Sequence, residues 1–156
     1  MKLFKDNVFI DDINDIASNL SRVMKSGDIV IFKGDIGAGK TTLIKSLVKH
    51  LGCEDEVTSP TFSIVNTYGD FVVHIDTYRL ESVNELYDLG FETLFDEKFI
   101  TFIEWGERIQ DYIDKEHFVI EIIEKDRDQR TIYFETSGDR EKDIVAELKN
   151  DGWLDV

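Results

Sequence analysis

Short apolar runs alternate along this chain with segments in which apolar residues recur three or four positions apart. Apolar runs lie within 28–34 (DIVIFKG), 62–76, 98–105, 117–124 and 130–136. Runs of this length that are apolar at most positions are typical of buried strands. We expect helices where the spacing is helical, in 11–27, 41–51 and 139–153.

The residues at the expected boundaries favour the same elements. Asp11 or Asp12 is a suitable N-cap for the first helix, and Gly27 is a suitable stop. Residues 68–70 (YGD) have the composition of a hairpin turn, which divides 62–76 into two strands.

The alternation of strands and helices favours an α/β fold with a mixed, mostly parallel central sheet flanked by helices. One or two short helices in 82–95 and a charged turn at 125–129 complete the expected elements. A chain of 156 residues can bury a substantial core without disulfides, and Cys53 has no second cysteine with which to pair.

Charge limits the class of partner. The sequence holds 18 Lys and Arg against 33 Asp and Glu, a formal net charge of −15. Because such a surface repels polyanions, we expect no direct binding of nucleic acid by this chain. No apolar run approaches the ~20 residues of a membrane helix, and the N-terminal residues do not resemble a secretion signal. We therefore expect a cytoplasmic protein without membrane contact.

One segment, GDIGAGKT at 34–41, carries clear chemistry. It fits the phosphate-binding pattern GxxxxGK[ST] and lies between an expected buried strand and an expected helix. The backbone N–H groups of such a loop and the positive end of the following helix attract phosphate oxygens. Lys40 would reach the β- and γ-phosphates, and the Thr41 hydroxyl would bind Mg²⁺. A loop that merely turns the chain would leave Lys40 at a helix N-terminus, which disfavours a cation.

The expected nucleotide-binding residues are therefore the loop and its neighbour: Gly34, Asp35, Ile36, Gly37, Ala38, Gly39, Lys40, Thr41 and Thr42. A dinucleotide fingerprint starting at Gly37 fails, because Thr42 stands where a third glycine is required. We expect a single P-loop NTPase domain over residues 1–156.

Two acidic residues end apolar strands, Asp76 after VVHI and Glu104 after FITFI. The carboxyl edge of a parallel sheet is where ligands of open α/β folds collect. We therefore expect Asp76 and Glu104 to be catalytic with Lys40, and to form the metal site with Thr41; each acid could bind Mg²⁺ directly or through water, or orient the nucleophile. The simpler alternative is that each acid is solvated or caps a helix.

Other segments are less specific. Residues 56–68 (EVTSPTFSIVNTY) hold several hydroxyl side chains that could contact a γ-phosphate, or they form an ordinary connection. The three histidines, His50, His74 and His117, are not spaced as metal ligands, and we expect core or surface roles for them.

Four motifs taken together, GDIGAGKTTLIKSL, SPTFSIVNTY, HIDTYRL and FIEWGERI, closely resemble the TsaE family, also called YjeE. The resemblance runs from about residue 10 to residue 134. It implies the ATPase of bacterial tRNA threonylcarbamoyladenosine modification, with ATP and Mg²⁺ as cofactors. It also implies a compact P-loop fold.

The resemblance further implies two partner proteins, TsaB and TsaD. TsaD carries the threonylcarbamoyl transfer to the adenosine beside the tRNA anticodon, so that tRNA is met only through the complex. ATP hydrolysis would depend on these partners and would reset the complex between turnovers. Matched residue by residue, Lys40, Thr41 and Thr42 correspond to the family's loop residues, and Asp76 and Glu104 to its two acids. Trp105 corresponds to its tryptophan.

The sequence leaves the roles of several arginine and aromatic residues open. Arg130 is included among the expected nucleotide-binding residues, but Arg127, Arg130 and Arg79 are each equally compatible with a surface role. Aromatic residues that could anchor a partner, or lie in the core, are Tyr68, Tyr78, Phe91, Phe95 and Trp105.

Two other functions share the same loop. A small kinase, which passes the γ-phosphate to a metabolite or nucleoside, would also need an acceptor site and an arginine-bearing lid. No segment is long or basic enough to be an obvious lid. The other is a nucleotide-dependent switch with negligible hydrolysis.

Overall fold

The computed structural model describes residues 1–54, 65–78, 80, 82–88, 90, 97–105, 109–126 and 128–156. The strands are β1 (Lys2–Val8), β2 (Ile29–Lys33), β3 (Val65–Tyr68), β4 (Val72–Asp76), β5 (Ile100–Glu104), β6 (Phe118–Glu124), β7 (Arg130–Glu135) and β8 (Leu154–Asp155). The helices are α1 (Ile13–Val23), α2 (Lys40–His50), α3 (Val83–Asp88) and α5 (Glu141–Asn150), with short 3₁₀ turns η1 (Ile10–Asp12) and η3 (Gln110–Tyr112).

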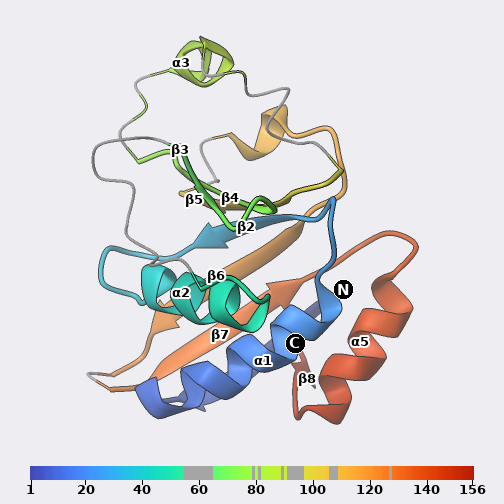
Figure 1. Ribbon diagram of the computed structural model, residues 1–156. Coiled ribbons are helices and arrows are strands. Elements are labelled where there is room, and N and C mark those ends of the chain that lie inside the picture. Colours follow the sequence, from blue (N-terminus) through green and yellow to red (C-terminus); the bar gives the residue numbers. More distant parts are fainter. Residues whose placement is uncertain are drawn as a thin grey trace.

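All eight strands join one sheet in the order β3-β4-β5-β2-β6-β7-β1-β8 (Figure 1). The central strands β4, β5, β2 and β6 are parallel to one another. The outer pairings, β3 with β4, β6 with β7, and β1 with both β7 and β8, are antiparallel. The mixed α/β sheet expected from the sequence is confirmed, and its parallel part is the central four strands.

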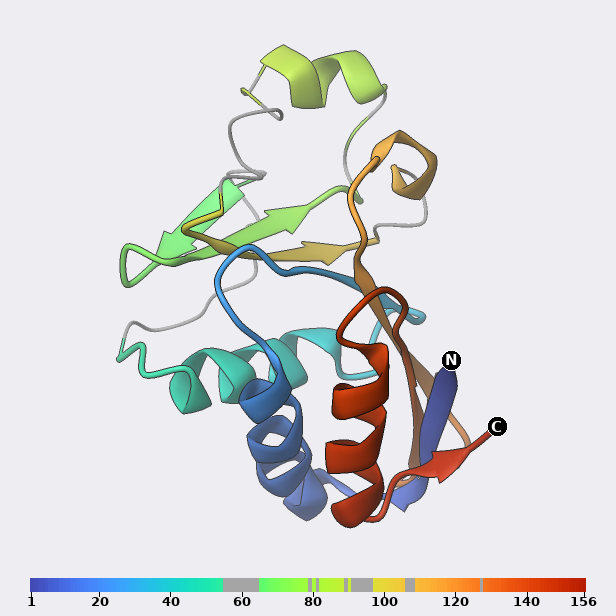
Figure 2. The same ribbon diagram turned by 90° about the vertical axis from the view of Figure 1, so that its right-hand side faces the viewer.

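Helices α1, α2 and α5 cover one face of the sheet (Figures 1 and 2). Their buried apolar residues pack with Val30, Phe32, Phe102 and Phe134 in the larger core cluster. The alternate residues of the central strands, such as Ile31, belong to a smaller core cluster on the opposite face of the sheet. The central strands are thus buried on both faces, which explains why their sequences are apolar at nearly every position.

The hairpin between β3 and β4 forms at the expected turn. Gly69 and Asp70 both have positive φ, 49° and 47°. Two such residues in succession define the turn whose twist matches that of antiparallel strands. The hairpin places β4 beside β5, with Asp76 at its end.

The two end strands of the chain were not expected. β1 has only Leu3 and Val8 buried, and β8 comprises two exposed residues. Both lie at the edge of the sheet farthest from β3, where the two termini also lie close together (Figure 2). The N-cap of α1 is Asp12, one of the two expected, but its carboxylate accepts a hydrogen bond from the Phe9 N–H instead of capping α1.

Some expectations concern residues outside the described part of the chain. They are residues 56–64 of the hydroxyl-rich segment, residues 91–95 with Phe91 and Phe95, and Arg79 and Arg127. Within the described ranges, no helix is long and apolar enough to cross a membrane.

Candidate functional site

The glycine-rich loop connects β2 to α2, as the pattern predicts. A Cβ on Gly34 would lie 2.7 Å from the carbonyl oxygen of Ile122 on the neighbouring strand β6, so glycine is required at this position. Gly39 is the N-cap of α2 and has a φ of 112°, a conformation that other residues rarely adopt. The exposed turn at Asp35, Ile36 and Gly37 lies between them.

Lys40, the first residue of α2, is buried beneath this loop. Its ammonium group donates a hydrogen bond to the Gly34 carbonyl. The same group lies 3.4 Å from the centre of the Trp105 ring. These two contacts compensate for the unfavourable position of a cation at a helix N-terminus.

The sheet brings the two expected acids together. Asp76 at the end of β4 and Glu104 at the end of β5 are direct partners in the parallel register. Glu104 is buried, with 3% of its surface exposed, and its Oε1 accepts a hydrogen bond of 3.2 Å from the Thr41 hydroxyl. The first turn of α2 and the ends of β4 and β5 therefore converge on one place.

The environment of Asp76 favours its protonated form. Burial raises the pKa of the Asp76 carboxyl above its ordinary value of 3.8, and the neighbouring Glu104 charge raises it further. The Tyr78 backbone N–H opposes this shift by donating a 3.0 Å hydrogen bond to Oδ1. A paired carboxyl site with a raised pKa is a common feature of functional sites.

The backbone after Glu104 is held in an unusual conformation. Trp105 has a φ of 61°, in the left-handed region that costs energy for a bulky residue. The buried Thr77 hydroxyl lies 3.0 Å from the Glu104 carbonyl oxygen and 2.7 Å from that of Trp105. These contacts tie the end of β5 to the end of β4, and they place the Trp105 ring next to Lys40.

Arg130, the first residue of β7, contacts the glycine-rich loop. Its Nε donates a 3.0 Å hydrogen bond to the Ala38 carbonyl. It lines a pocket of about 530 Å³ whose other walls include Phe9, Ile10 and Thr42. The structure therefore brings Arg130 to the loop, and its contact with a nucleotide stays a prediction.

The candidate metal ligands fit Mg²⁺ in their chemistry. Thr41, Asp76 and Glu104 offer oxygen atoms only, which is the donor type that Mg²⁺ prefers. The described residues contain no group of three or more His, Cys, Asp or Glu side chains that could hold a metal ion. Two acids beside a phosphate-binding loop agree with Mg²⁺, which is commonly held by one or two carboxylates together with phosphates.

The sequence interpretation missed the importance of one histidine. His74 is fully buried, and its Nε2 lies 2.8 Å from Oε2 of Glu104. A strand alternates its faces every residue, so His74 shares a face with Asp76, two positions later. That spacing was the signal available in the sequence. Among the candidate partner anchors, Tyr68 is buried, Trp105 is half-buried and Tyr78 is exposed.

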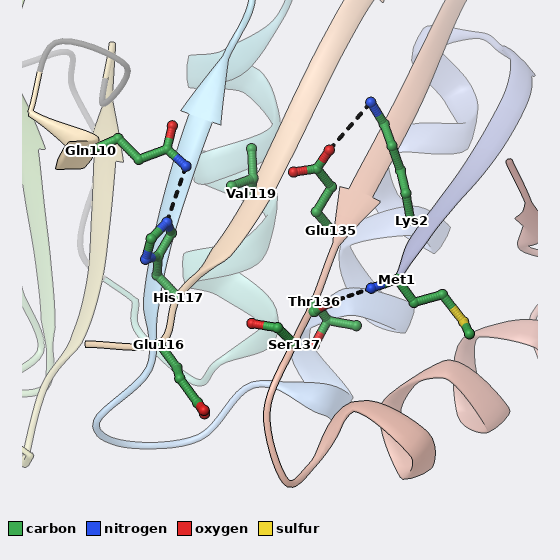
Figure 3. A pocket seen from close by; sticks show the side chains of 9 residues that line it. All are labelled: Met1, Lys2, Gln110, Glu116, His117, Val119, Glu135, Thr136 and Ser137. Carbon is green, nitrogen blue, oxygen red and sulfur yellow. Dashed lines mark hydrogen bonds and ion pairs between the residues drawn. The ribbon is translucent and has the colours of Figure 1, made fainter. Parts of the chain in front are cut away.

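A second pocket, of about 440 Å³, lies where the parallel strand β6 begins, away from the carboxyl ends that carry Asp76 and Glu104 (Figure 3). It is lined by the start of β6 and the end of β7. Four of its charged or polar side chains form two pairs: Lys2 pairs with Glu135, and Gln110 contacts His117. We place the functional site at the glycine-rich loop, where the charged groups converge on one place.

The strand, loop and helix, with acids at the ends of the neighbouring parallel strands, define this protein as a P-loop NTPase in fold. Comparison with known proteins gives the family. The family model described as "Threonylcarbamoyl adenosine biosynthesis protein TsaE" matches residues 10–132. The chain belongs to the TsaE family, which confirms the resemblance of the four motifs.

Individual relatives of this chain support the same family. A Bacillus subtilis protein named tRNA threonylcarbamoyladenosine biosynthesis protein TsaE is 36% identical over 136 residues, which cover 85% of each chain. A Haemophilus influenzae protein of the same name is 33% identical over 125 residues, 78% of each chain. The crystal structure of Bacillus subtilis YdiB superimposes with a TM-score of 0.75 at 28% identity, over 97% of both chains.

Proposed function

We propose that this protein binds and hydrolyses ATP with Mg²⁺ as a component of the tRNA threonylcarbamoyladenosine machinery, acting with TsaB and TsaD. Its membership of the TsaE family supports the pathway. The chemistry rests chiefly on one observation: the buried Glu104 carboxylate accepts a hydrogen bond from the Thr41 hydroxyl of the loop, and Asp76 is its partner in register.

The loop supplies the groups that hold phosphates. Its backbone N–H groups and the N-terminus of α2 provide partial positive charge, and Lys40 adds a full charge. The pocket beside the loop offers the apolar surfaces of Phe9, Ile10 and Ile13, on which a nucleoside base can lie. Arg130 at its rim can pair with a phosphate.

Thr41 and Glu104 would hold Mg²⁺, with Asp76 beside them. When bound with ATP, Mg²⁺ neutralises charge that develops on the phosphates. The Thr41 hydroxyl donates a hydrogen bond to Glu104, which leaves the oxygen lone pairs of Thr41 available. In the same arrangement, one of the two acids can orient the attacking water as a hydrogen-bond acceptor.

The acidic composition is compatible with work inside a complex. A protein of net charge −15 would contact partner proteins while those partners hold the tRNA. Exposed Tyr78 packs against Trp105, with ring centres 5.0 Å apart, directly beside the loop. A partner that covers these rings would also cover the site, which would make hydrolysis depend on the complex.

The test is ATP hydrolysis by the purified protein, alone and with TsaB and TsaD. We expect little turnover alone and clear stimulation when both partners are present. Efficient transfer of the γ-phosphate to a small metabolite or nucleoside by the isolated chain would instead identify a kinase. Nucleotide binding with no hydrolysis under any of these conditions would identify a binding switch.

A further inference from the structure

A buried chain of side chains leads from the edge of the sheet to the candidate metal site. Tyr68 on β3 contacts His74 on β4, with 3.4 Å between the hydroxyl oxygen and Nδ1. His74 in turn contacts Glu104 on β5, with 2.8 Å between Nε2 and Oε2. The other oxygen of Glu104 accepts from Thr41 on α2. Neighbouring strands thus place three side chains in one line toward the loop.

The direction of the hydrogen bonds follows from the acceptor at the end of this line. An ionised carboxylate only accepts, so Nε2 of His74 is the donor. In the neutral ring, Nδ1 is then the acceptor, and the Tyr68 hydroxyl donates to it. Each oxygen of Glu104 therefore has one donor, His74 for Oε2 and Thr41 for Oε1.

Two donors on opposite oxygens fix the rotation of the Glu104 carboxylate. A glutamate side chain has three rotatable bonds, and a carboxylate held by the Thr41 hydroxyl alone could rotate about that contact. The His74 ring cannot follow such a rotation, because it is fully buried and is carried by β4, a strand paired on both sides. The ring therefore holds Oε1 toward the loop.

From this geometry we propose that His74 is a positioning residue that holds Glu104 in the orientation needed to bind the metal. The inference rests on the proposed function, because it assumes that Glu104 takes part in holding Mg²⁺. Groups that hydrogen-bond to metal-binding carboxylates typically change metal affinity by about 10- to 100-fold when they are removed. His74 acts through Glu104 and needs no contact with nucleotide.

The test compares His74→Leu with His74→Gln. Glutamine can place an N–H near the position of Nε2, whereas leucine fills the space without a donor. Ile75→Val is the matched control, because Ile75 is equally buried on β4 but faces the opposite cluster. Binding of Mn²⁺ in the presence of ADP, followed by electron paramagnetic resonance, measures metal affinity without turnover.

We expect His74→Leu to weaken Mn²⁺ binding by about 10- to 100-fold. Affinity for ADP in the presence of EDTA should stay within about twofold of the parent, because His74 contacts Tyr68 and Glu104, neither of which belongs to the phosphate-binding loop. His74→Gln should recover most of the Mn²⁺ affinity, and Ile75→Val should keep it. In hydrolysis assays, the loss in His74→Leu should be reduced by raising the Mg²⁺ concentration.

Several results would overturn the inference. Unchanged Mn²⁺ affinity in His74→Leu, or equal losses in the leucine and glutamine variants, would reduce His74 to a packing role. If His74→Leu does not fold, Tyr68→Phe decides, because it removes the hydroxyl that orients the ring; unchanged Mn²⁺ affinity there counts against the proposal. Failure of the parent protein to bind Mn²⁺ with ADP would instead overturn the proposed function, and with it this inference.

Discussion

The ammonium group of Lys40 lies over the ring of Trp105, 3.4 Å from its centre. Phosphate oxygens compete with the ring for this ammonium, because they offer it full negative charge. We therefore expect ADP to change the fluorescence of Trp105. Trp153→Phe should keep the signal, since the buried Trp153 packs against Phe134, away from the loop. Loss of the ADP response in Trp153→Phe would show that the wrong indole was assigned.

Lys40 and Glu104 should separate binding from hydrolysis. Lys40→Ala removes the charge that meets ground-state phosphates, and we expect it to weaken ADP binding by about 100-fold. Glu104→Gln keeps the side-chain shape but removes the charge, and should lower the hydrolysis rate in the complex by about 10²- to 10³-fold while sparing most nucleotide binding. Calorimetry and single-turnover hydrolysis measure the two effects. Parent-like hydrolysis by Glu104→Gln would contradict the role of the acid.

Removing the charge of Asp76 should stabilise the fold. Its pKa is raised on folding, so the folded state binds the proton more tightly, and ionised Asp76 destabilises the fold above its ordinary pKa of 3.8. Asp76→Asn should therefore increase the free energy of unfolding at pH 7, by up to about 1 kcal/mol for a half-buried group. The gain should disappear as the pH falls below 3.8. Urea unfolding across pH checks this, and a gain that grows in acid would contradict the sign.

The same substitution should abolish or greatly reduce hydrolysis in the complex, because it removes one of the two acids at the site. A variant that is more stable but less active than the parent is what we expect when a residue with a catalytic role is replaced. If Asp76→Asn were both less stable and fully active, Asp76 would be a structural residue.

Thr77 should support the site through the backbone. Thr77→Val removes the hydroxyl that contacts the carbonyls of Glu104 and Trp105, and leaves both without this donor. We expect a loss of about 1–2 kcal/mol in the free energy of unfolding, together with slower hydrolysis. Thr77→Ser retains the hydroxyl and should keep most of both. Chemical denaturation of the two variants in parallel measures the difference; equal effects would assign the loss to packing.

Arg130 should contribute to nucleotide affinity. Arg130→Ala removes the hydrogen bond to the Ala38 carbonyl and a positive charge at the pocket rim. We expect ADP to bind about 3- to 10-fold more weakly. Arg22→Ala is the matched control, since Arg22 pairs with Asp151 away from this pocket. Titration with a fluorescent ADP analogue compares the two variants. If Arg130→Ala and Arg22→Ala bound the analogue equally well, Arg130 would have no role in nucleotide binding.

The loop and its two acids could be predicted because each carries a local signal. Gly34 to Thr41 form a known pattern, and Asp76 and Glu104 each end a strongly apolar run. The register that pairs the two acids depends on contacts between strands, which a single sequence does not show. His74 and Thr77 owe their roles to partners on β5. The alternation that puts His74 on the same face as Asp76 was a signal for His74, but the sequence does not show the partners.

The edge of the sheet escaped prediction for a different reason. In β1, the apolar positions are few, and the strand includes an irregularity between Lys5 and Val8 that breaks the alternation. β8 has no buried residue at all. Strands of this kind are formed by pairing with a neighbour and carry too little apolar character to be recognised alone.

The position of β1 has a consequence for how the protein is made. Lys2 pairs with Glu135, and Leu3 with Asp155, so both partners of the first strand come from the other end of the chain. During synthesis, β1 therefore leaves the ribosome long before anything exists for it to join. Strands β4 and β5 are close in sequence and can pair early. We expect the half of the sheet that holds the acids to assemble first, and the half that holds β1 to close only after β7 and β8 have been synthesised.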